Sequence, residues 1–484
     1  MKTQIIYLIL LILTVSCNTT TQKQATTQDT TTQTKADTLT VYSAEEIKSE
    51  ALRAWKAYKK YAWGYDVLLP LSKKGYNWYD ESLEISIFDA YSTLAVMGLK
   101  EEAKEIEKFA LAKDWNQDVY VQVFEVNIRI LGGLLAIYDD TQNPKILEKA
   151  IDFGDRLLPA FNSPTGIPYH SVNLKTGKTS GDQGKGKGNV VNVAQAATYL
   201  FEFGILSYYA KDPKYYQAAK KATKAVFERK SKIGLVGDYI DVETGKWTND
   251  WSYLQAGMDS YYEYMFKSNF LFPDPEVQKM WEFSLDKINQ YYAEDYQGKR
   301  FYACVNMHTG KIVKRSMSLY DAFFPAVQAL HGEVENAEKN MATWDWLWDK
   351  YGLLPTRYLY EADSIEYANS ELNPEIIESA YYLHQITGKD QYLKMIDKYW
   401  KDMKKCCRNE VAFHAVEDAR TKKAKDYLAT YFIAETLKYF YLAVIDKKVF
   451  DFNDYVFNTE AHPFKRSHFD KRKVKKYLGI ESND

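Results

Sequence analysis

The chain has 484 residues and a formal net charge of −2, because 63 lysines and arginines face 65 acidic residues. It lacks the excess of positive charge with which proteins bind the phosphates of nucleic acids, which excludes a polyanion binder. Its apolar content of 46% is enough for a large buried core.

The first 17 residues predict an export signal. Lys2 precedes an apolar run, residues 5–15, that is too short to span a bilayer, and Ser16 and Cys17 follow it. This pattern resembles a bacterial lipoprotein signal, although Thr14 stands where such signals usually have leucine. We therefore expect that Cys17 is acylated and that the protein is lipid-anchored in a bacterial cell envelope, at the periplasmic or outer-membrane surface.

Residues 18–43 are rich in threonine and glutamine, and this composition is typical of a disordered linker. The remaining cysteines are Cys304, Cys406 and Cys407, and no two of them have the CxxC spacing. A structural zinc site and a disulfide framework are therefore not expected. Stability must come from packing.

From Ala44 onward, apolar residues recur at intervals of three and four, which predicts helices and no long sheet. Short and long connections mostly alternate, which is typical of repeated helical hairpins, and about seven hairpins could close into a ring. We expect the long loops to build the binding face. The predicted domain is 44–470, followed by a charged tail, 471–484. The predicted helices are 44–62, 82–98, 100–112, 119–138, 144–161, 190–210, 213–229, 252–270, 275–293, 317–331, 333–351, 374–387, 390–405 and 427–446.

Every second predicted helix begins on the long-loop side, and four of these helices contain the acidic residues Glu125, Asp259, Glu375 and Glu435. Each has an ordinary explanation. Glu375 follows a proline at a helix start, where an acidic residue is favoured, and Asp259 could also belong to a plain helix start. Glu125 could form a surface ion pair with Arg129, four residues further along the helix. Four acids inside one ring are harder to explain, since buried carboxylates are costly unless they are paired, hydrated or bound to a cation.

A hydroxyl and a carboxylate, Thr459 and Glu460, lie just beyond the last predicted helix, followed by His462 and Pro463. The ordinary interpretation is a frayed helix exit. The alternative is a site in which these groups join the acids upstream.

Several segments together resemble glycoside hydrolase family 47, the class I α-1,2-mannosidases, across about residues 50–463. The segments 412–441 and 323–325 are most similar to the ER-degradation mannosidase-like branch. The blocks that carry the resemblance are residues 55–71, 124–135 (FEVNIRILGGLL), 153–169, 259–264 (DSYYEY), 374–379 (PEIIES), 434–441 (AETLKYFY) and 458–463 (NTEAHP).

The resemblance implies an all-α fold, an (α/α)7 barrel, and a bound calcium ion (Ca²⁺) held by Thr459. It implies hydrolysis with inversion, in which Glu125 is the general acid, Glu375 is the base and Asp259 is a third catalytic acid. The residues it implies for sugar binding are Arg129, Glu378, Tyr431, Glu435 and Glu460.

The sequence departs from the family at Asn373, where an arginine is common, and at Gln195 and Ala429, where glutamate is common. The leading hypothesis is a monomeric, calcium-dependent exo-α-mannosidase that acts on mannan or high-mannose glycans and touches the membrane only through its anchor. A non-catalytic mannose-binding lipoprotein and a helical scaffold for protein partners remain as alternatives. The departures predict a glycan preference different from that of the family's glycan-trimming enzymes.

Overall fold

The computed structural model describes residues 41–183 and 189–481. The predicted export signal with Cys17, and residues 18–40 of the predicted linker, lie outside the described residues. No helix among the described residues is both long and apolar enough to cross a membrane.

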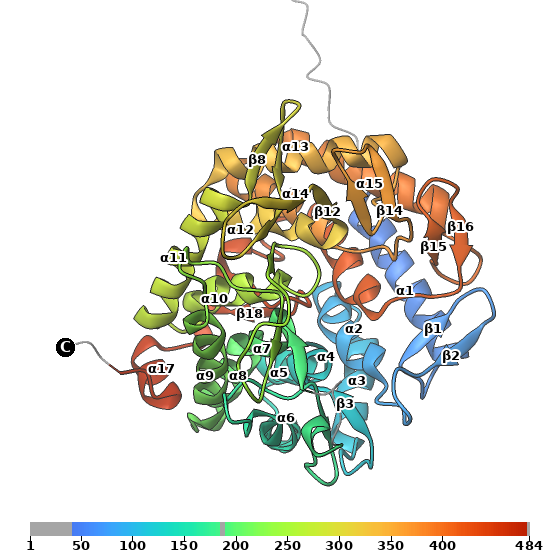
Figure 1. The fold of residues 1–484 in the computed structure, drawn as a ribbon. Coiled ribbons are helices and arrows are strands. Elements are labelled where there is room, and N and C mark those ends of the chain that lie inside the picture. The colour runs from blue at the N-terminus through green and yellow to red at the C-terminus, as the bar shows by residue number, and fades with distance from the viewer. Residues whose placement is uncertain (1–40, 184–188, 482–484) are drawn as a thin grey trace, which may run out of the picture. The chain divides into compact units, whose positions relative to one another are not determined.

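Helices of the described chain form two concentric layers, and the colour in Figure 1 runs once around the ring. The outer layer consists of α1 (Ala44–Tyr61), α3 (Lys100–Ala112), α6 (Pro144–Leu157), α9 (Lys214–Glu228), α11 (Pro275–Tyr291), α13 (Val334–Tyr351) and α15 (Asp390–Cys407). The inner layer consists of α2 (Ile85–Val96), α4–η1–α5 (Val123–Val126, Asn127–Leu131, Gly132–Thr141), α7–α8 (Val193–Ala197, Leu200–Ala210), α10 (Asp259–Leu271), η4–α12 (Leu319–Phe323, Phe324–His331), α14 (Glu375–Thr387) and η5–α16 (Phe432–Thr436, Leu437–Leu442).

The inner layer closes on itself. In order around the ring, α2 contacts α5, α5 contacts α8, α8 contacts α10, and α10 contacts η4. Then α12 contacts α14, α14 contacts α16, and η5 contacts α2 again. The fold is therefore the (α/α)7 barrel that we predicted.

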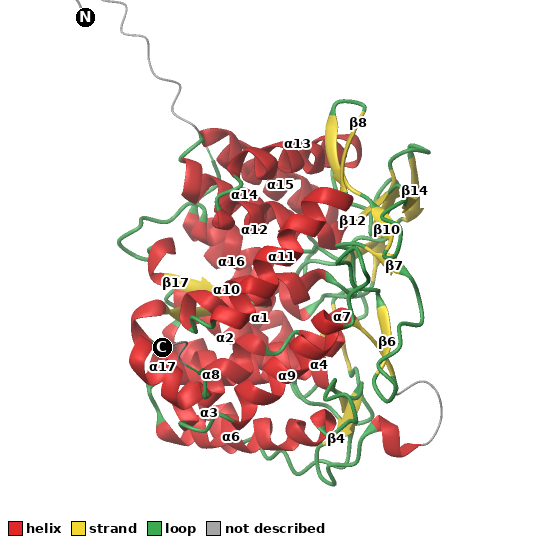
Figure 2. Cartoon of the chain, turned by 60° about the vertical axis from the view of Figure 1, so that its left-hand side comes forward, coloured by secondary structure: helices red, strands yellow, loops and turns green. Residues whose placement is uncertain are grey.

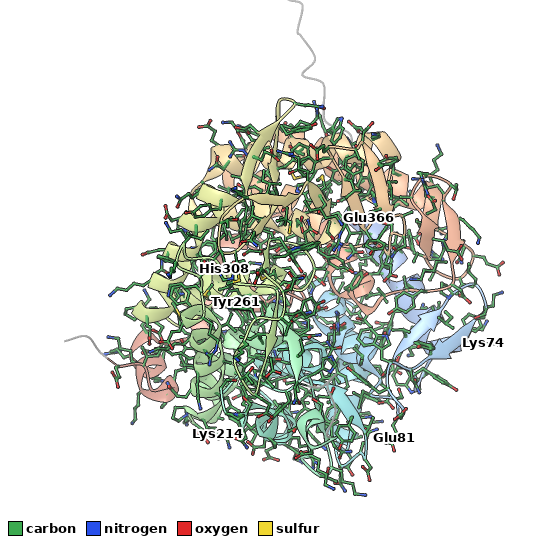
Figure 3. All side chains as sticks on the ribbon, in the orientation of Figure 1. Lys74, Glu81, Lys214, Tyr261, His308 and Glu366 are labelled. Atoms are coloured by element: carbon green, nitrogen blue, oxygen red, sulfur yellow. The ribbon has the colours of Figure 1, made fainter. Side chains whose placement is uncertain are left out.

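Burial explains which helices lie inside. Every residue of α10 from Ser260 to Ser268 is buried, whereas α15 buries one stripe at three-to-four spacing and exposes lysines on its other side. In Figure 3, Tyr261 of α10 lies towards the middle of the molecule and Lys214 of α9 at its edge. The hydrophobic core lies between the two layers and within the inner one.

Short strands in the long loops form a ring of antiparallel ribbons, which we call the collar. Figure 2 shows most of them along one side of the barrel. The pairs β3–β4, β5–β6, β7–β10 and β12–β13 join successive loops, and isolated bridges Ser370–Val416 and Leu68–Leu428 continue the ring. The collar strands are β1 (Val67–Leu69), β2 (Lys74–Tyr76), β3 (Tyr120–Gln122), β4 (Ser171–Asn173), β5 (Val190–Asn192), β6 (Tyr239–Asp241), β7 (Trp251–Ser252), β8 (Ala293–Tyr296), β9 (Lys299–Tyr302), β10 (Cys304–Asn306), β11 (Ile312–Lys314), β12 (Ser316–Ser318), β13 (Arg357–Leu359), β14 (Ser364–Tyr367), β15 (Ala415–Asp418) and β16 (Lys423–Lys425).

Four predicted helix starts were too early, at 119, 190, 252 and 317. At each, the first residues belong to a collar strand, and their backbone groups bond to a neighbouring loop in place of a helical turn. The predicted helix 190–210 is also interrupted at Thr198–Tyr199, between α7 and α8.

The segment after the last inner helix is a hairpin of β17 (Tyr455–Phe457) and β18 (Pro463–Lys465), so the interpretation as a frayed helix exit was wrong. Its loop, residues 458–462, reaches the inner layer. A Cβ on Gly132 of α5 would lie 3.0 Å from Asn458 Nδ2 and 3.1 Å from His462 Cδ2. A larger residue at position 132 would press on these two side chains, so the glycine favours this close packing of the loop.

The predicted charged tail, 471–484, contains helix α17 (Lys471–Leu478), which packs against α8 and α9. Val474 and Leu478 are buried there, and Tyr477 contacts the ring of Tyr208. The folded domain thus continues past residue 470, because two apolar residues one turn apart give the basic segment a face to bury.

Candidate active site

A cavity of about 520 Å³ opens at the collar side of the barrel. Its wall is made mainly by segments that follow collar strands, at the starts of the inner helices. All nine residues predicted for catalysis, sugar binding and calcium line it: Glu125, Arg129, Asp259, Glu375, Glu378, Tyr431, Glu435, Thr459 and Glu460.

Helix starts position the three predicted catalytic acids. Asp259 and Glu375 are the first residues of α10 and α14, and Glu125 is in the first turn of α4. The free N–H groups and the positive end of the dipole favour negative charge at such positions. Strand β3 ends at Gln122, directly before α4, and so fixes where the helix that carries Glu125 begins.

Two π-helical turns, η1 and η5, lie in inner helices that both pack against α2, and they carry Arg129 and Glu435. A π turn adds a residue to a helical turn and re-aims the side chains around it, and such turns often occur at functional sites. Here both side chains reach the cavity wall.

Arg129 links the acids of this wall. Its Nε donates to Glu125 Oε2 at 2.9 Å, and its Nη1 donates to Asp89 Oδ2 at 3.2 Å and also to Glu460. Its guanidinium lies 5.4 Å from the ring of Trp78. The Glu125–Arg129 pair is therefore part of a partly buried network, and the interpretation as an isolated surface pair was wrong.

The lining carries far more negative than positive charge. Arg129 is the one cation among its residues, and eight carboxylates line the same cavity: Glu125, Asp259, Glu263, Glu371, Glu375, Glu378, Glu435 and Glu460. Burial raises the pKa of Asp259 to about 7 and raises the pKa of Glu375 and Glu435 well above the ordinary range. Such a site favours a cation.

Glu375 has an unused acceptor. Its Oε1 accepts a long hydrogen bond, 3.4 Å, from Asn373 Nδ2, whereas its Oε2 is buried and has no hydrogen-bond partner among the described residues. A buried carboxylate oxygen normally has a hydrogen-bond partner, so Oε2 retains the capacity to accept a hydrogen bond from a bound molecule.

Thr459 is held by the loop around it. Its N–H donates to Tyr264 OH at 3.3 Å and its Oγ1 lies 3.0 Å from Ser260 Oγ. Asn458 Oδ1 accepts from the N–H groups of Glu460 and His462, which folds residues 458–462 into a tight turn. The Thr459 hydroxyl is thereby presented to the cavity.

The donor set fits calcium. It consists of oxygen atoms only, which suits a hard cation, and the excess of carboxylates supplies the charge. No three His, Cys, Asp or Glu side chains in the described ranges converge to hold a metal by themselves. An ion at Thr459 would therefore take water ligands, oriented by the carboxylates.

Residues 458–462 also close the inner end of the cavity. Asn458 Nδ2 donates to Glu202 Oε1 at 2.8 Å, and His462 Nδ1 lies 2.8 Å from Ser92 Oγ in α2. Asn458 and His462 are fully buried. The cavity is a blind pocket with its mouth on the collar side.

Two of the three departures line the cavity, Asn373 and Gln195, whereas Ala429 is buried and is not part of the lining. Gln195 Oε1 accepts from the N–H of Asn192, and Asn192 Oδ1 accepts from the N–H of Gln195 at 2.8 Å. This capping box begins α7, so the Gln195 amide serves the helix start.

Three charged residues at the site were not predicted from the sequence: Glu263, Lys267 and Glu371. Lys267 is 1% exposed, and its Nζ donates to Glu263 Oε1 at 2.6 Å and to Glu378 Oε1 at 3.0 Å. The spacing of Asp259, Glu263 and Lys267, four residues each along one helix, could have identified this group. Glu371 lies in a loop with no periodic pattern to reveal it.

Comparisons with known proteins identify the family of the chain. The family model described as glycosyl hydrolase family 47 matches residues 50–466. The chain is 31% identical over 453 residues to the ER degradation-enhancing alpha-mannosidase-like protein 2 of Homo sapiens, covering 87% of this chain and 77% of that protein. It is also 31% identical over 441 residues to the mannosyl-oligosaccharide 1,2-alpha-mannosidase MNS1 of Arabidopsis thaliana, covering 87% and 78%.

Among solved structures, the alpha-1,2-mannosidase from Trichoderma reesei superposes with a TM-score of 0.80 at 22% identity, covering 87% of this chain and 98% of that one. This likeness shows the shared fold. With a family model that spans most of the sequence and relatives above 30% identity, the chain belongs to glycosyl hydrolase family 47.

Proposed function

We propose that the protein is a calcium-dependent exo-α-mannosidase that removes terminal α-linked mannose from mannan or high-mannose glycans with inversion. The observation that carries the proposal is that Glu125, Glu375 and Thr459 line one blind, carboxylate-rich cavity. A pocket closed at its inner end admits the end of a glycan and not its middle. This supports exo action.

Glu125 is the proposed general acid. Its Oε2 is held by Arg129, and its Oε1 accepts no hydrogen bond from the described residues, which leaves that oxygen for the glycosidic oxygen of the substrate. Because Arg129 is itself held by Asp89 and Glu460, the position of Glu125 is fixed before substrate binds.

Glu375 is the proposed base. Its unpartnered Oε2 is where an attacking water would be held, and inversion requires such a water on the face of the sugar opposite the acid. Asp259 is the proposed third acid, which orients the sugar or this water. A calcium ion at Thr459 would supply a positive charge that binds two hydroxyls of the terminal mannose.

The remaining predicted sugar contacts, Glu378, Tyr431, Glu435 and Glu460, lie on the wall around this point. Asn373 and Gln195 line the cavity and are neutral at positions where the family commonly has charged residues, so neither can make a charged contact to the sugar. We therefore propose that the preferred substrate differs from the usual high-mannose N-glycan, in linkage or in the sugars that follow the terminal one.

The test is mannose release from an α-1,2-linked mannobiose, with calcium and with EDTA. Glu125→Gln and Glu375→Gln should each lower kcat about 10²-fold or more. The control is Glu335→Gln, since Glu335 is 83% exposed on the outer helix α13 and should leave the rate unchanged. If the wild-type protein binds the disaccharide in calcium but releases no mannose, it is a mannose-binding protein and not an enzyme.

We also propose that the protein acts in a bacterial cell envelope, held by a lipid on Cys17. The support is the sequence of residues 1–17. Labelling with a palmitate analogue and membrane fractionation test it, and Cys17→Ser should lose both the label and the membrane association. Equal fractionation of the two proteins would reject the anchor.

A further inference from the structure

Two small residues line the cavity between α7 and α10. They are Ala256 and Gly257, and Gly257 has a φ of +97°, which strongly favours glycine. A Cβ on Gly257 would lie 3.3 Å from the side chain of Asn192. The glycine therefore brings the cavity wall into contact with Asn192, the last residue of β5.

Asn192 connects the cavity wall with the β5–β6 ribbon of the collar. It lines the cavity, and it pairs directly with Tyr239 in the antiparallel ribbon β5–β6. Directly paired residues carry their side chains on the same face of a ribbon, with Cβ atoms about 4.5–5.5 Å apart. The ring of Tyr239 thus adjoins the cavity mouth, beyond Gly257 and Asn192.

Both side chains have unused capacity for a ligand. Tyr239 is 43% exposed, and within the described chain its side chain has no hydrogen bond and no ring contact. Asn192 Oδ1 is occupied by the N–H of Gln195, but Asn192 Nδ2 donates to no group of the described residues. An apolar ring face next to a free amide donor suits a sugar, which presents C–H groups on its faces and hydroxyls at its edges.

We propose that Tyr239 and Asn192 form a saccharide subsite outside the cavity, which binds the sugars that follow the terminal mannose. In this arrangement the ring of Tyr239 stacks on one pyranose and Asn192 Nδ2 donates to a hydroxyl. The inference rests on the proposed function and goes beyond it. It predicts that longer α-mannooligosaccharides are better substrates than the disaccharide.

Tyr76 shows what an exposed aromatic residue looks like without such a connection. It is also an exposed tyrosine on a collar strand, 52% accessible, and its side chain likewise has no hydrogen bond or ring contact within the described ranges. Its paired residue is Val67, which does not line the cavity. Tyr76→Ala is therefore the matched control for Tyr239→Ala.

The experiment compares kcat/KM for α-1,2-linked mannobiose and for a linear α-1,2-linked mannotetraose. We expect Tyr239→Ala to lower the value for the tetrasaccharide at least fivefold more than that for the disaccharide, through KM. Tyr239→Phe keeps the ring and should restore most of the loss. Tyr76→Ala should leave the ratio of the two values at that of the wild type, and equal melting temperatures would show that every variant folds.

A Tyr239→Ala variant that keeps the wild-type ratio, or that loses both activities equally, overturns the subsite. This result is distinct from failure of the proposed function, in which the wild type hydrolyses neither substrate. In that case calorimetric titration with the tetrasaccharide in calcium decides, and equal affinities of the wild type and Tyr239→Ala, or no binding by either, reject the subsite.

Discussion

Arg129 shows at the scale of one residue how the site is balanced. Burial lowers the pKa of Arg129, but three carboxylates that approach its guanidinium, those of Glu460, Glu125 and Asp89, outweigh burial and hold the pKa well above the ordinary value. Asp89 is fully buried, and its Oδ1 has no hydrogen-bond partner among the described residues, the ring of His462 lying 3.9 Å away. The arginine is thus the charge that makes burial of its neighbours tolerable.

Replacing Arg129 should therefore destabilise the protein as well as inactivate it. Arg129→Ala leaves Asp89 and Glu460 buried without their cation, which should cost about 3–5 kcal/mol of unfolding free energy. Urea denaturation measures this, with Arg420→Ala as the control, because Arg420 forms an exposed pair with Asp418. A loss for Arg129→Ala no larger than that for the control would contradict the buried network.

The raised pKa values predict how calcium binding depends on pH. Burial raises the pKa of Asp259 to about 7, so this carboxyl is still partly protonated at pH 6.5, and burial also raises the pKa of Glu375 well above its ordinary value. A cation favours the ionised form, so its binding should release protons below about pH 7 and become tighter as the pH rises through 7. Titration calorimetry in buffers of different ionisation enthalpy measures the release.

The same shifts give a sign for stability without calcium. A carboxyl whose pKa is higher in the folded than in the unfolded protein stabilises the folded state at low pH. For Asp259 this stabilisation is complete below the unfolded pKa, near 4, and is lost as the pH rises through the folded pKa of about 7. The gain in melting temperature on adding calcium should therefore be larger at pH 7.5 than at pH 5. Calcium affinity that is equal at pH 6 and pH 8, with no proton release, would contradict both predictions.

At the scale of elements, the packing of α5 against the loop 458–462 links the barrel to the proposed calcium ligand. Gly132 faces this loop, whereas the adjacent Gly133 faces α2, where a Cβ would lie 2.6 Å from the carbonyl oxygen of Phe88. The two glycines permit two different close contacts from one turn of helix.

This pair predicts a separation of effects. Gly132→Ala should weaken calcium binding several-fold, because the added methyl group displaces Asn458 and His462 and with them Thr459. Gly133→Ala should mainly lower stability, by about 1–3 kcal/mol, since the methyl group meets backbone that cannot move easily. Calcium titration and urea denaturation of both variants check this, and equal calcium affinity in Gly132→Ala and the wild type would sink the link.

The helices could be predicted from the sequence, whereas the collar strands could not. The helices were predictable because stripes such as Tyr392, Ile396, Tyr399 and Met403 in α15 repeat every three to four residues. The collar strands are two to four residues long and pair between distant loops, so no local pattern revealed them. Glu125 and Glu375 were recognisable from their blocks, whereas Glu371 and Lys425 meet only because two loops fold together.

At the scale of the molecule, the ring explains why residues far apart in the chain make one site. The inner helices bring their starts together at one end, the collar holds those starts, and the β17–β18 hairpin closes the other end. Thr459 and Glu125 are more than 300 residues apart and line the same cavity. The last segment of the chain thus completes a site that the earlier hairpins outline.

Thr459 should therefore couple calcium to the stability of the whole domain. Bound metal adds RT ln(1 + [L]/Kd) to the unfolding free energy, which is about 2.7 kcal/mol at a hundredfold excess over Kd. The wild type should melt at a higher temperature in calcium than in EDTA, and Thr459→Ala should remove this difference. Identical melting curves of the wild type in calcium and in EDTA would argue against a calcium site.

The most direct test of the central claim is proton NMR of the wild-type protein acting on α-1,2-linked mannobiose in calcium. We expect β-mannose to appear first and to convert slowly to the equilibrium mixture, with no product in EDTA. This outcome requires an acid and a base on opposite faces of the sugar, the roles proposed for Glu125 and Glu375. First appearance of α-mannose would contradict the account, and so would the absence of released mannose both from this disaccharide and from mannan oligosaccharides with other α-linkages.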